Sequence, residues 1–245
     1  MTTSMRRYRL RWLAIVATVI FAATAAISGV TASSALAAGP CTVTPDSTYF
    51  AASCWGSSVP LTGMTVAFTV PPNPSSTGKS NFSIWGGLQS SNASALLRNV
   101  LVWSGSSWSF YPEYYTVSKN TNYPAIPVSA GQTLVSKTSS SDCGSAGQCI
   151  WTLTAEDVSS GKSSVSQAIV STSTFNTLFG GVLEVHSASG CLSLPSDGHI
   201  AFRDISVENL NFQYPTPQFY AGTPNRQCSM TASATATSTD FLWTP

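Results

Sequence analysis

The sequence predicts an all-β fold, a single antiparallel β-sandwich domain. Short runs in which apolar and polar residues alternate are separated by clusters of Ser, Gly, Pro, Asn and Thr. This spacing is typical of antiparallel sandwiches, whereas parallel βαβ units place a helical segment between strands. Beyond the first 38 residues, no long segment has a convincing period of 3.6 residues. We therefore expect two packed sheets and at most a single helical turn.

The first 38 residues are predicted to be a signal peptide. Four arginines within residues 6–11 form a positive end, and residues 13–27 are almost wholly apolar. Small residues follow, so we expect cleavage near Ala37 or Ala38. An uncleaved membrane anchor is the alternative, but the apolar run is shorter than the ~20 residues that span a bilayer. Residues 39–245 would then form the secreted domain.

The charge of the secreted part argues against two classes of partner. The chain has 11 basic and 10 acidic residues, and four of the basic ones lie in the leader. A mature chain that is weakly acidic has no footprint for nucleic acid or anionic lipid. We therefore expect no nucleic-acid partner, no membrane contact after cleavage, and a monomer.

The cysteines predict three disulfides, because an even number in an exported chain indicates a disulfide framework. All six lie after the leader. Six cysteines allow fifteen pairings. We expect local loops for the first four and a longer one for the rest: Cys41 with Cys54, Cys143 with Cys149, and Cys191 with Cys228.

The strands are predicted from the alternation, in chain order. The first, 64–70, ends at Pro71-Pro72, because proline cannot donate to a sheet ladder. One helical turn is possible within 173–179, and the tail 230–239 is predicted to be an edge strand. The predicted strands cover residues 64–70, 82–88, 97–103, 108–117, 132–137, 149–155, 164–171, 181–187 and 199–208.

No metal or cofactor is expected. A zinc site is the alternative to disulfides, but there is no Cys-x-x-Cys, and only His186 and His199 could assist. No cluster of Asp and Asn has the ligand spacing of a calcium-binding loop. The one adjacent acidic pair, Glu156-Asp157, is better explained by a turn. The common motifs of serine hydrolases, metalloproteases and nucleotide-binding proteins are absent, so these functions lose their sequence support.

The segment 180–187 contains the main candidate for catalysis. In a strand, Glu184 and His186 share one face, while Leu183 and Val185 share the other. If the two apolar residues face the core, Glu184 and His186 line the opposite surface together. A carboxylate there suits a general acid or base. The alternative is an ordinary solvated sheet face.

Aromatic residues crowd the segment 103–115. On a concave sheet such a row forms a platform for sugar rings or an extended peptide. The alternative, which is more frequent in β-proteins, is that alternating aromatics belong to the core. The candidate substrate-binding residues of this segment are Trp103, Trp108, Tyr111 and Glu113, with Tyr111, Glu113 and Tyr115 on one face of the strand.

The order of four segments resembles a known family. They are Ile84-Trp85-Gly86-Gly87-Leu88, then 96–103, then 108–115, then Pro127 to Gln132. This order resembles the glutamic peptidases called eqolisins and their secreted relatives in the concanavalin A-like lectin/glucanase superfamily. The resemblance covers roughly 82–207 and implies a jelly-roll sandwich. In those peptidases a Trp-x-Gly strand precedes a strand with a catalytic glutamine, and a later strand supplies a catalytic glutamate.

Carried over to this chain, the glutamate falls on Glu184, but the glutamine position is occupied by Arg98. In the family, the carboxylate activates a water and the glutamine amide steadies the oxyanion. The guanidinium of Arg98 could also stabilise an oxyanion, although it would pair with Glu184. Gln89 is the alternative amide.

Three functions remain as hypotheses. The first is a secreted hydrolase that binds a polymer, peptide or polysaccharide, across a concave sheet, with Glu184 as general acid or base. A retaining glycosidase needs a second carboxyl nearby, for which the sequence offers only Glu113. The second is a non-catalytic, lectin-like carbohydrate-binding module. The third is a cell-wall-associated surface protein.

Overall fold

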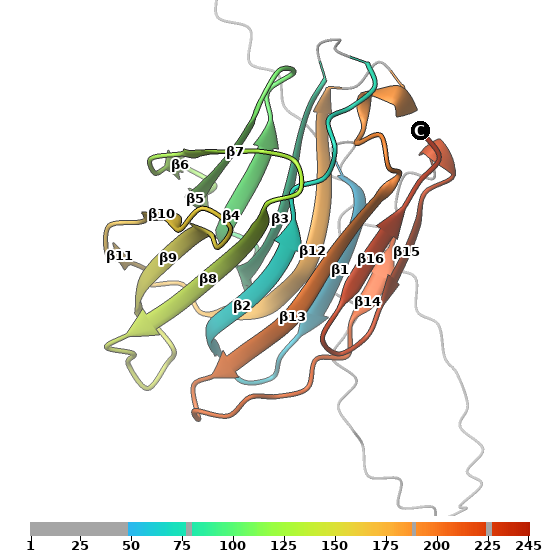
Figure 1. The fold of residues 1–245 in the computed structure, drawn as a ribbon. Coiled ribbons are helices and arrows are strands. Elements are labelled where there is room, and N and C mark those ends of the chain that lie inside the picture. Colours follow the sequence, from blue (N-terminus) through green and yellow to red (C-terminus); the bar gives the residue numbers. More distant parts are fainter. Residues whose placement is uncertain (1–48, 77–79, 188–189, 224–226) are drawn as a thin grey trace, which may run out of the picture. The chain divides into compact units, whose positions relative to one another are not determined.

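Two antiparallel sheets of eight strands each form a β-sandwich in the computed structural model of the chain (Figure 1). The structure describes residues 49–76, 80–187, 190–223 and 227–245. These residues contain no α-helix and only two short 3₁₀ turns, Cys191–Ser193 and Gln227–Ser229. The predicted all-β sandwich is therefore confirmed. The signal peptide and its cleavage site lie outside the described residues and stay predictions.

The first sheet brings distant parts of the sequence together. Its long central strand β12 lies between β1, near the start of the described chain, and β3 (Figure 1). Glu184 of β12 thereby pairs with Ser83 of β3. The strands, in sheet order, are β14 (Tyr220–Gly222), β1 (Tyr49–Gly56), β12 (Phe175–Ser187), β3 (Asn81–Ser90), β4 (Ala95–Trp103), β5 (Trp108–Thr116) and β6 (Lys119–Asn122), with β7 (Ile126–Val128) also paired to β5.

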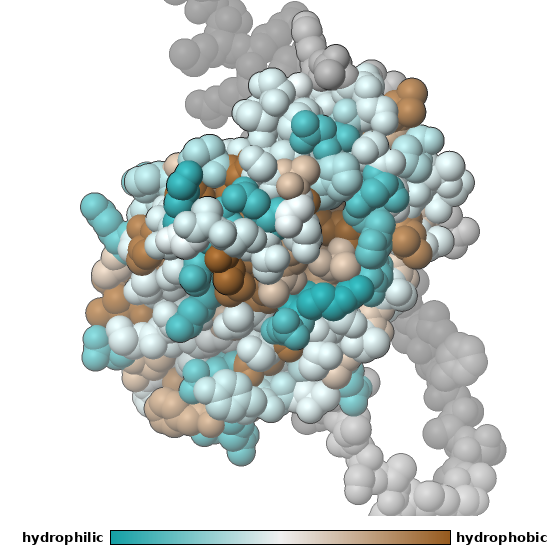
Figure 2. All heavy atoms as spheres, in the orientation of Figure 1, coloured by the Kyte–Doolittle hydropathy of each residue, from teal (hydrophilic) through white to brown (hydrophobic). Residues whose placement is uncertain are grey.

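The second sheet covers the inner face of the first. Its outer face is turned to the viewer in Figure 2, where apolar side chains are scattered among polar ones. The strands, in sheet order, are β10 (Lys162–Val165), β9 (Ile150–Asp157), β8 (Thr133–Ser141), β2 (Leu61–Thr69), β13 (His199–Asn209), β16 (Thr239–Leu242) and β15 (Thr231–Ala234), with β11 (Ile169–Val170) paired to β9.

The core between the sheets follows the predicted alternation. Leu183 and Val185 are buried in the main core, so Glu184 lies on the other face of β12. Phe68 of the second sheet packs edge-on against Phe110 of the first, with 5.7 Å between ring centroids. Burial of aromatic rings of this size is a large part of what holds such sheets together.

The structure differs from the expectations in a few elements. The helical turn within 173–179 was predicted wrongly, because β12 already begins at Phe175 and buries Phe175 and Leu178. Strands β1, β6, β7 and β14 were not predicted. The tail is a hairpin, in which β15 is the edge strand and β16 buries Phe241 beside β13. Asp157 accepts backbone hydrogen bonds from Ser159 and Ser160, which confirms the turn there.

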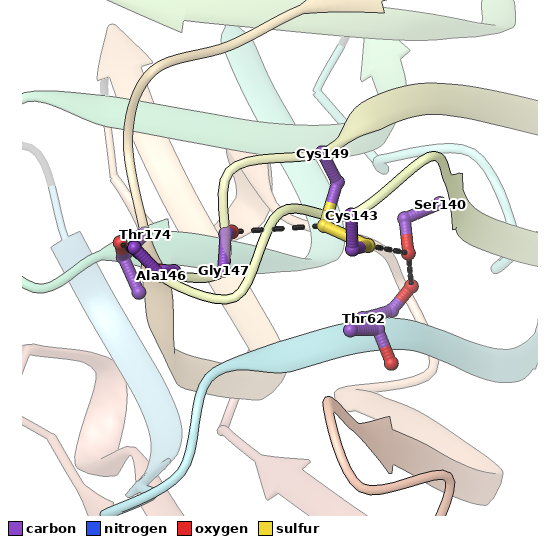
Figure 3. The surroundings of a disulfide bond; sticks show 7 residues. All are labelled: Thr62, Ser140, Cys143, Ala146, Gly147, Cys149 and Thr174. Carbon is purple, nitrogen blue, oxygen red and sulfur yellow. Dashed lines mark hydrogen bonds between the residues drawn. A yellow bond between two sulfur atoms is a disulfide. The ribbon is translucent and has the colours of Figure 1, made fainter.

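Two disulfides are formed as predicted, Cys143–Cys149 and Cys191–Cys228. The first closes a loop that is tied to its surroundings (Figure 3): Ser140 donates to the carbonyl of Thr62 at 2.6 Å. Cys41 lies outside the described residues, so its pairing with Cys54 stays a prediction. Across the described ranges, no helix combines the length and apolar character that crossing a membrane requires.

The two disulfides should contribute unequally to stability. The bonded cysteines are 37 residues apart in Cys191–Cys228 and 6 apart in Cys143–Cys149. A longer loop restricts the unfolded chain more, so removing the first pair as Cys→Ala should lower the free energy of unfolding by about 4 kcal/mol, against about 2 kcal/mol for the second. Urea denaturation of both double variants measures this. The reverse order would contradict the entropic explanation.

Candidate active site

One arginine joins two glutamates on the outer face of the first sheet. Arg98 of β4 donates from Nε to Oε1 of Glu113 on β5, at 2.5 Å. Its Nη1 donates to Oε2 of Glu184 on β12, at 2.9 Å. The three side chains, here called the Arg98 triad, are almost buried, with 11%, 4% and 11% of their surfaces exposed. Because two carboxylates share one guanidinium, the triad has one negative charge in excess.

Sheet register brings the triad together. Arg98 lies directly opposite Glu113 in the β4–β5 pair. Glu184 is one strand further away, because β3 lies between β12 and β4. Arg98 crosses that strand over Trp85, with its guanidinium carbon 4.6 Å from the ring centroid. The guanidinium of Arg98 therefore lies over the indole of Trp85 on its way to Glu184, and a cation–π contact stabilises this position.

Two glycines after Trp85 allow this close packing. A Cβ on Gly87 would lie 2.9 Å from the Cβ of Arg98, its register partner. A Cβ on Gly86 would lie 2.9 Å from Cγ1 of Val66 in the second sheet. The Trp-Gly-Gly sequence thus gives room to the arginine on one face and to the opposing sheet on the other.

The Glu184 carboxylate is held through one of its oxygens. Oε2 accepts hydrogen bonds from Arg98, from Trp85 Nε1 at 3.0 Å, and from Ser83 Oγ at 3.3 Å. No residue of the described chain donates to Oε1. Charge-assisted bonds of this kind fix an ionised carboxylate in place. Glu184 is therefore oriented through Oε2, while Oε1 has no donor among the described residues.

The triad also sets the protonation of its neighbours. Burial acts to lower the pKa of Arg98, but the charges and hydrogen bonds of Glu113 and Glu184 outweigh it, so the pKa is raised. The guanidinium stays protonated. Burial, then the charge of Glu113, raises the pKa of Tyr111. Its phenol is therefore a neutral donor at physiological pH.

A pocket of about 310 Å³ opens beside the triad. Most of the groups around it are hydrogen-bonding side chains, and two charged residues on its wall, Arg98 and Glu113, pair with each other. Such a lining suits a polar, uncharged ligand group. Glu184 is not part of the lining but touches two residues that are. The pocket is lined by Asn81, Ser83, Arg98, Val100, Val102, Tyr111, Glu113, Asn120, Asn122 and His186.

The structure brings together several of the residues singled out from the sequence. Arg98 and Glu184 are in direct contact. Tyr111 and His186 line the pocket with Glu113. Glu113 shares the face of Tyr111, as predicted, but its direct contact is with Arg98 rather than with open solvent.

Other candidates lie elsewhere. Trp103 and Trp108 are 2% and 3% exposed in the main core, where their rings pack against each other with centroids 5.1 Å apart. Neither can form part of a substrate platform while it is buried there. Gln89 is on β3 beyond Gly87 and does not line the pocket.

Sequence reasoning missed three supporting residues. Ser83 and Trp85 both donate to Glu184, and Asn120 Nδ2 donates to Oε2 of Glu113 at 3.3 Å. Ser83 and Trp85 are two residues apart on one strand, so alternation already places them on one face. Nothing in the sequence indicates that this face is the one shared with Glu184.

A larger hollow, of about 540 Å³, lies on the second sheet. Its ionisable residues include Arg203 and His199, which both bind Asp240, at 2.6 and 3.0 Å from Oδ1. The hydrogen bond from Arg203 is the main cause that lowers the pKa of Asp240. These groups are partly solvent-exposed and satisfy one another, so the hollow is the weaker candidate for chemistry.

The sandwich is the fold of the glutamic peptidases. Scytalido-glutamic peptidase, solved with a peptide-based transition-state analogue, superimposes with a TM-score of 0.60 at 15% identity, over 80% of this chain and 98% of that one. SCP-B of the eqolisin family, solved with the tripeptide Ala-Ile-His, gives 0.55 at 15% identity and the same coverage. No protein-family model and no curated protein sequence matches the chain. At these identities the shared property is the fold, and the predicted resemblance is confirmed at that level.

Removing the central charge of the triad should be strongly destabilising. Arg98→Met leaves Glu113 and Glu184 buried without a counter-charge, so we expect the free energy of unfolding to fall by about 3–5 kcal/mol. The triple variant Arg98→Met, Glu113→Gln, Glu184→Gln should recover most of this, because no buried charge remains. Urea denaturation at pH 7 measures both. A single variant as stable as the wild type would show that water replaces the arginine without cost.

Proposed function

We propose that the chain is a secreted hydrolase in which Glu184 acts as general base and Arg98 stabilises the oxyanion. The observation that carries this proposal is the contact between the two residues on the outer face of the first sheet, beside a polar pocket. The fold of the glutamic peptidases supports it, and the sequence resemblance implies a catalytic glutamate at Glu184, with Arg98 in place of the family's glutamine. Hydrolysis of a peptide bond in a polymeric substrate is the reaction that suits this pair of residues.

In this proposal the reaction begins at Oε1 of Glu184, which receives no hydrogen bond from the described residues. A water held by Oε1 attacks the substrate carbonyl carbon and gives a proton to the carboxylate. The carbonyl oxygen becomes an oxyanion as the new C–O bond forms. Collapse of this intermediate breaks the C–N bond, and Glu184 returns the proton to the departing nitrogen. The carboxylate is then restored.

Arg98 has donors left for the oxyanion. A guanidinium has five N–H groups. The structure uses one on Nε for Glu113 and one on Nη1 for Glu184, and no other described residue accepts from it. Its remaining donors and its position in the pocket wall suit an oxygen that gains negative charge. An arginine held between two carboxylates is also preorganised, so it need not reorient during the reaction.

The pocket supports binding of one polar unit of a polymer. Tyr111 and His186 lie in its wall, and Asn120 and Asn122 are exposed at β6. We extend the proposal to an extracellular setting, because the two disulfides fit an oxidising compartment. The predicted signal peptide points in the same direction.

A non-catalytic binding module is the second candidate. Glu184 does not line the pocket, and its Oε2 already has three donors. In this case the Arg98 triad would be a structural support, and the pocket would bind a neutral glycan without cleaving it. Both candidates use the same face of the first sheet, so one variant separates them.

The deciding variant is Glu184→Gln, which keeps shape and hydrogen bonding but removes the base. The purified, oxidised protein would be assayed on denatured protein and on plant and microbial polysaccharides from pH 2 to 8. We expect the wild type to cleave one class and the variant to lose at least about 100-fold in kcat. Glu156→Gln, an exposed glutamate of β9 on the second sheet, is the matched control and should keep full activity.

The wild type and Glu184→Gln must unfold at the same urea concentration for the comparison to hold. If neither of them then cleaves any substrate, hydrolysis of the substrates in this panel is excluded. Retention of the wild-type protein on an insoluble glycan would then support the binding module. A Glu184→Gln variant as active as the wild type would show that another group supplies the base.

A further inference from the structure

We propose that His186 and Ser83 position the Glu184 carboxylate through a hydrogen-bond chain of fixed direction, from His186 Nε2–H to Ser83 Oγ–H to Glu184 Oε2. The inference rests on the proposed function, because it assigns a task to two residues beside the proposed base. His186 and Ser83 are positioning residues, since they act only through Glu184.

Two contacts of equal length define the chain. Ser83 Oγ lies 3.3 Å from Glu184 Oε2 and 3.3 Å from His186 Nε2. Ser83 is buried, with 1% of its surface exposed, whereas His186 is exposed at the pocket. The hydroxyl is thus the internal link between a solvent-facing imidazole and a nearly buried carboxylate.

Counting protons gives the direction. A serine hydroxyl has one proton to donate and can accept from other donors. An ionised carboxylate can only accept. If Ser83 donates to Glu184, Nε2 of His186 must carry a proton and donate to Ser83. If Ser83 donates to His186 instead, Glu184 loses one of its donors.

The charge of the triad decides between these two arrangements. A hydrogen bond to a carboxylate is roughly twice as strong as one between neutral groups. The Arg98 triad has an uncompensated negative charge, which attracts the serine proton to Glu184. The ionisable groups that face His186 are Glu184 on its own strand, Arg98 on β4, and Tyr111 and Glu113 on β5. The paired strand β3 offers only neutral groups, and the side chain of Tyr49 on β1 is not described.

The opposite direction would have a different chemical meaning. A serine whose proton points at a histidine is the arrangement of a nucleophile and its base. The chain proposed here makes Ser83 a donor that holds the base, and it predicts that the hydroxyl is not nucleophilic. The two arrangements have the same heavy-atom distances, so the position of the proton must be measured.

Imidazole nitrogen shifts measure that position directly. The chain contains only two histidines, His186 and His199, so an ¹⁵N-histidine-labelled sample gives two sets of signals. His199 is an internal standard, because its Nε2 lies 3.0 Å from Asp240 Oδ1 and must carry the proton there. At a pH where both rings are neutral, we expect His186 to show the same Nε2–H tautomer. An Nδ1–H tautomer of His186 would overturn the proposal, and so would labelling of Ser83 by a fluorophosphonate.

Variants then test the positioning role. Ser83→Ala removes one donor from the proposed base, so kcat should fall about tenfold with KM nearly unchanged. His186→Leu should have a similar effect. His186→Gln should have a higher kcat than His186→Leu, because its amide nitrogen can also donate to Ser83. The control Ser206→Ala changes an exposed serine of β13 in the second sheet and should have no effect.

The outcomes separate the two proposals. Unchanged kcat in Ser83→Ala would overturn the positioning role, even with the expected tautomer. A kcat of His186→Gln no higher than that of His186→Leu would do the same, since a donor to Ser83 would then make no difference. If the wild type shows no hydrolysis, the proposed function fails, while the imidazole spectrum still decides whether the chain runs from His186 to Glu184.

Discussion

The sharing of one arginine between two buried glutamates is the constraint on which the candidate site depends. Arg98, Glu113 and Glu184 come from three strands, two of them adjacent and the third beyond β3. A buried carboxylate without a partner costs several kcal/mol, so the three strands must keep their register together. A slip of one residue in β4 would turn Arg98 into the core and leave both glutamates unpaired. The same contacts that hold the sheet therefore also orient Glu184.

The sequence was sufficient for the fold and for part of the site. Alternation located most strands, and it placed Glu184 and His186 on the face opposite Leu183 because a strand has a fixed period of two. Alternation within the 103–115 region alone does not show which face meets the second sheet. Trp103 has the parity of Leu97 and Leu101, which are buried, and the opposite parity to Arg98. Comparing parity with the one charged residue of that strand would have assigned Trp103 to the core.

Other features could not be found in the sequence for physical reasons. Short strands such as β6 and β14 lack enough residues to show any alternation. The contact between Arg98 and Glu184 spans 86 residues and crosses an intervening strand. Predicting this contact requires the order of the strands in the sheet, and the local sequence pattern does not contain that order. At the position where the resemblance to the glutamic peptidases implies an amide, this chain has a permanent cation, which pairs with both Glu113 and Glu184.

The placement of β12 also determines when the molecule can assemble during synthesis. Among the strands of the described ranges, β1 pairs only with β12 and β14, which follow it by more than a hundred residues. Of the described strands, the first to be made is thus among the last to find its partners, and its backbone groups stay open until most of the described chain has been made. A nascent chain that stops short of residue 175 can form the β3–β4–β5 meander but has neither the middle of its first sheet nor Glu184.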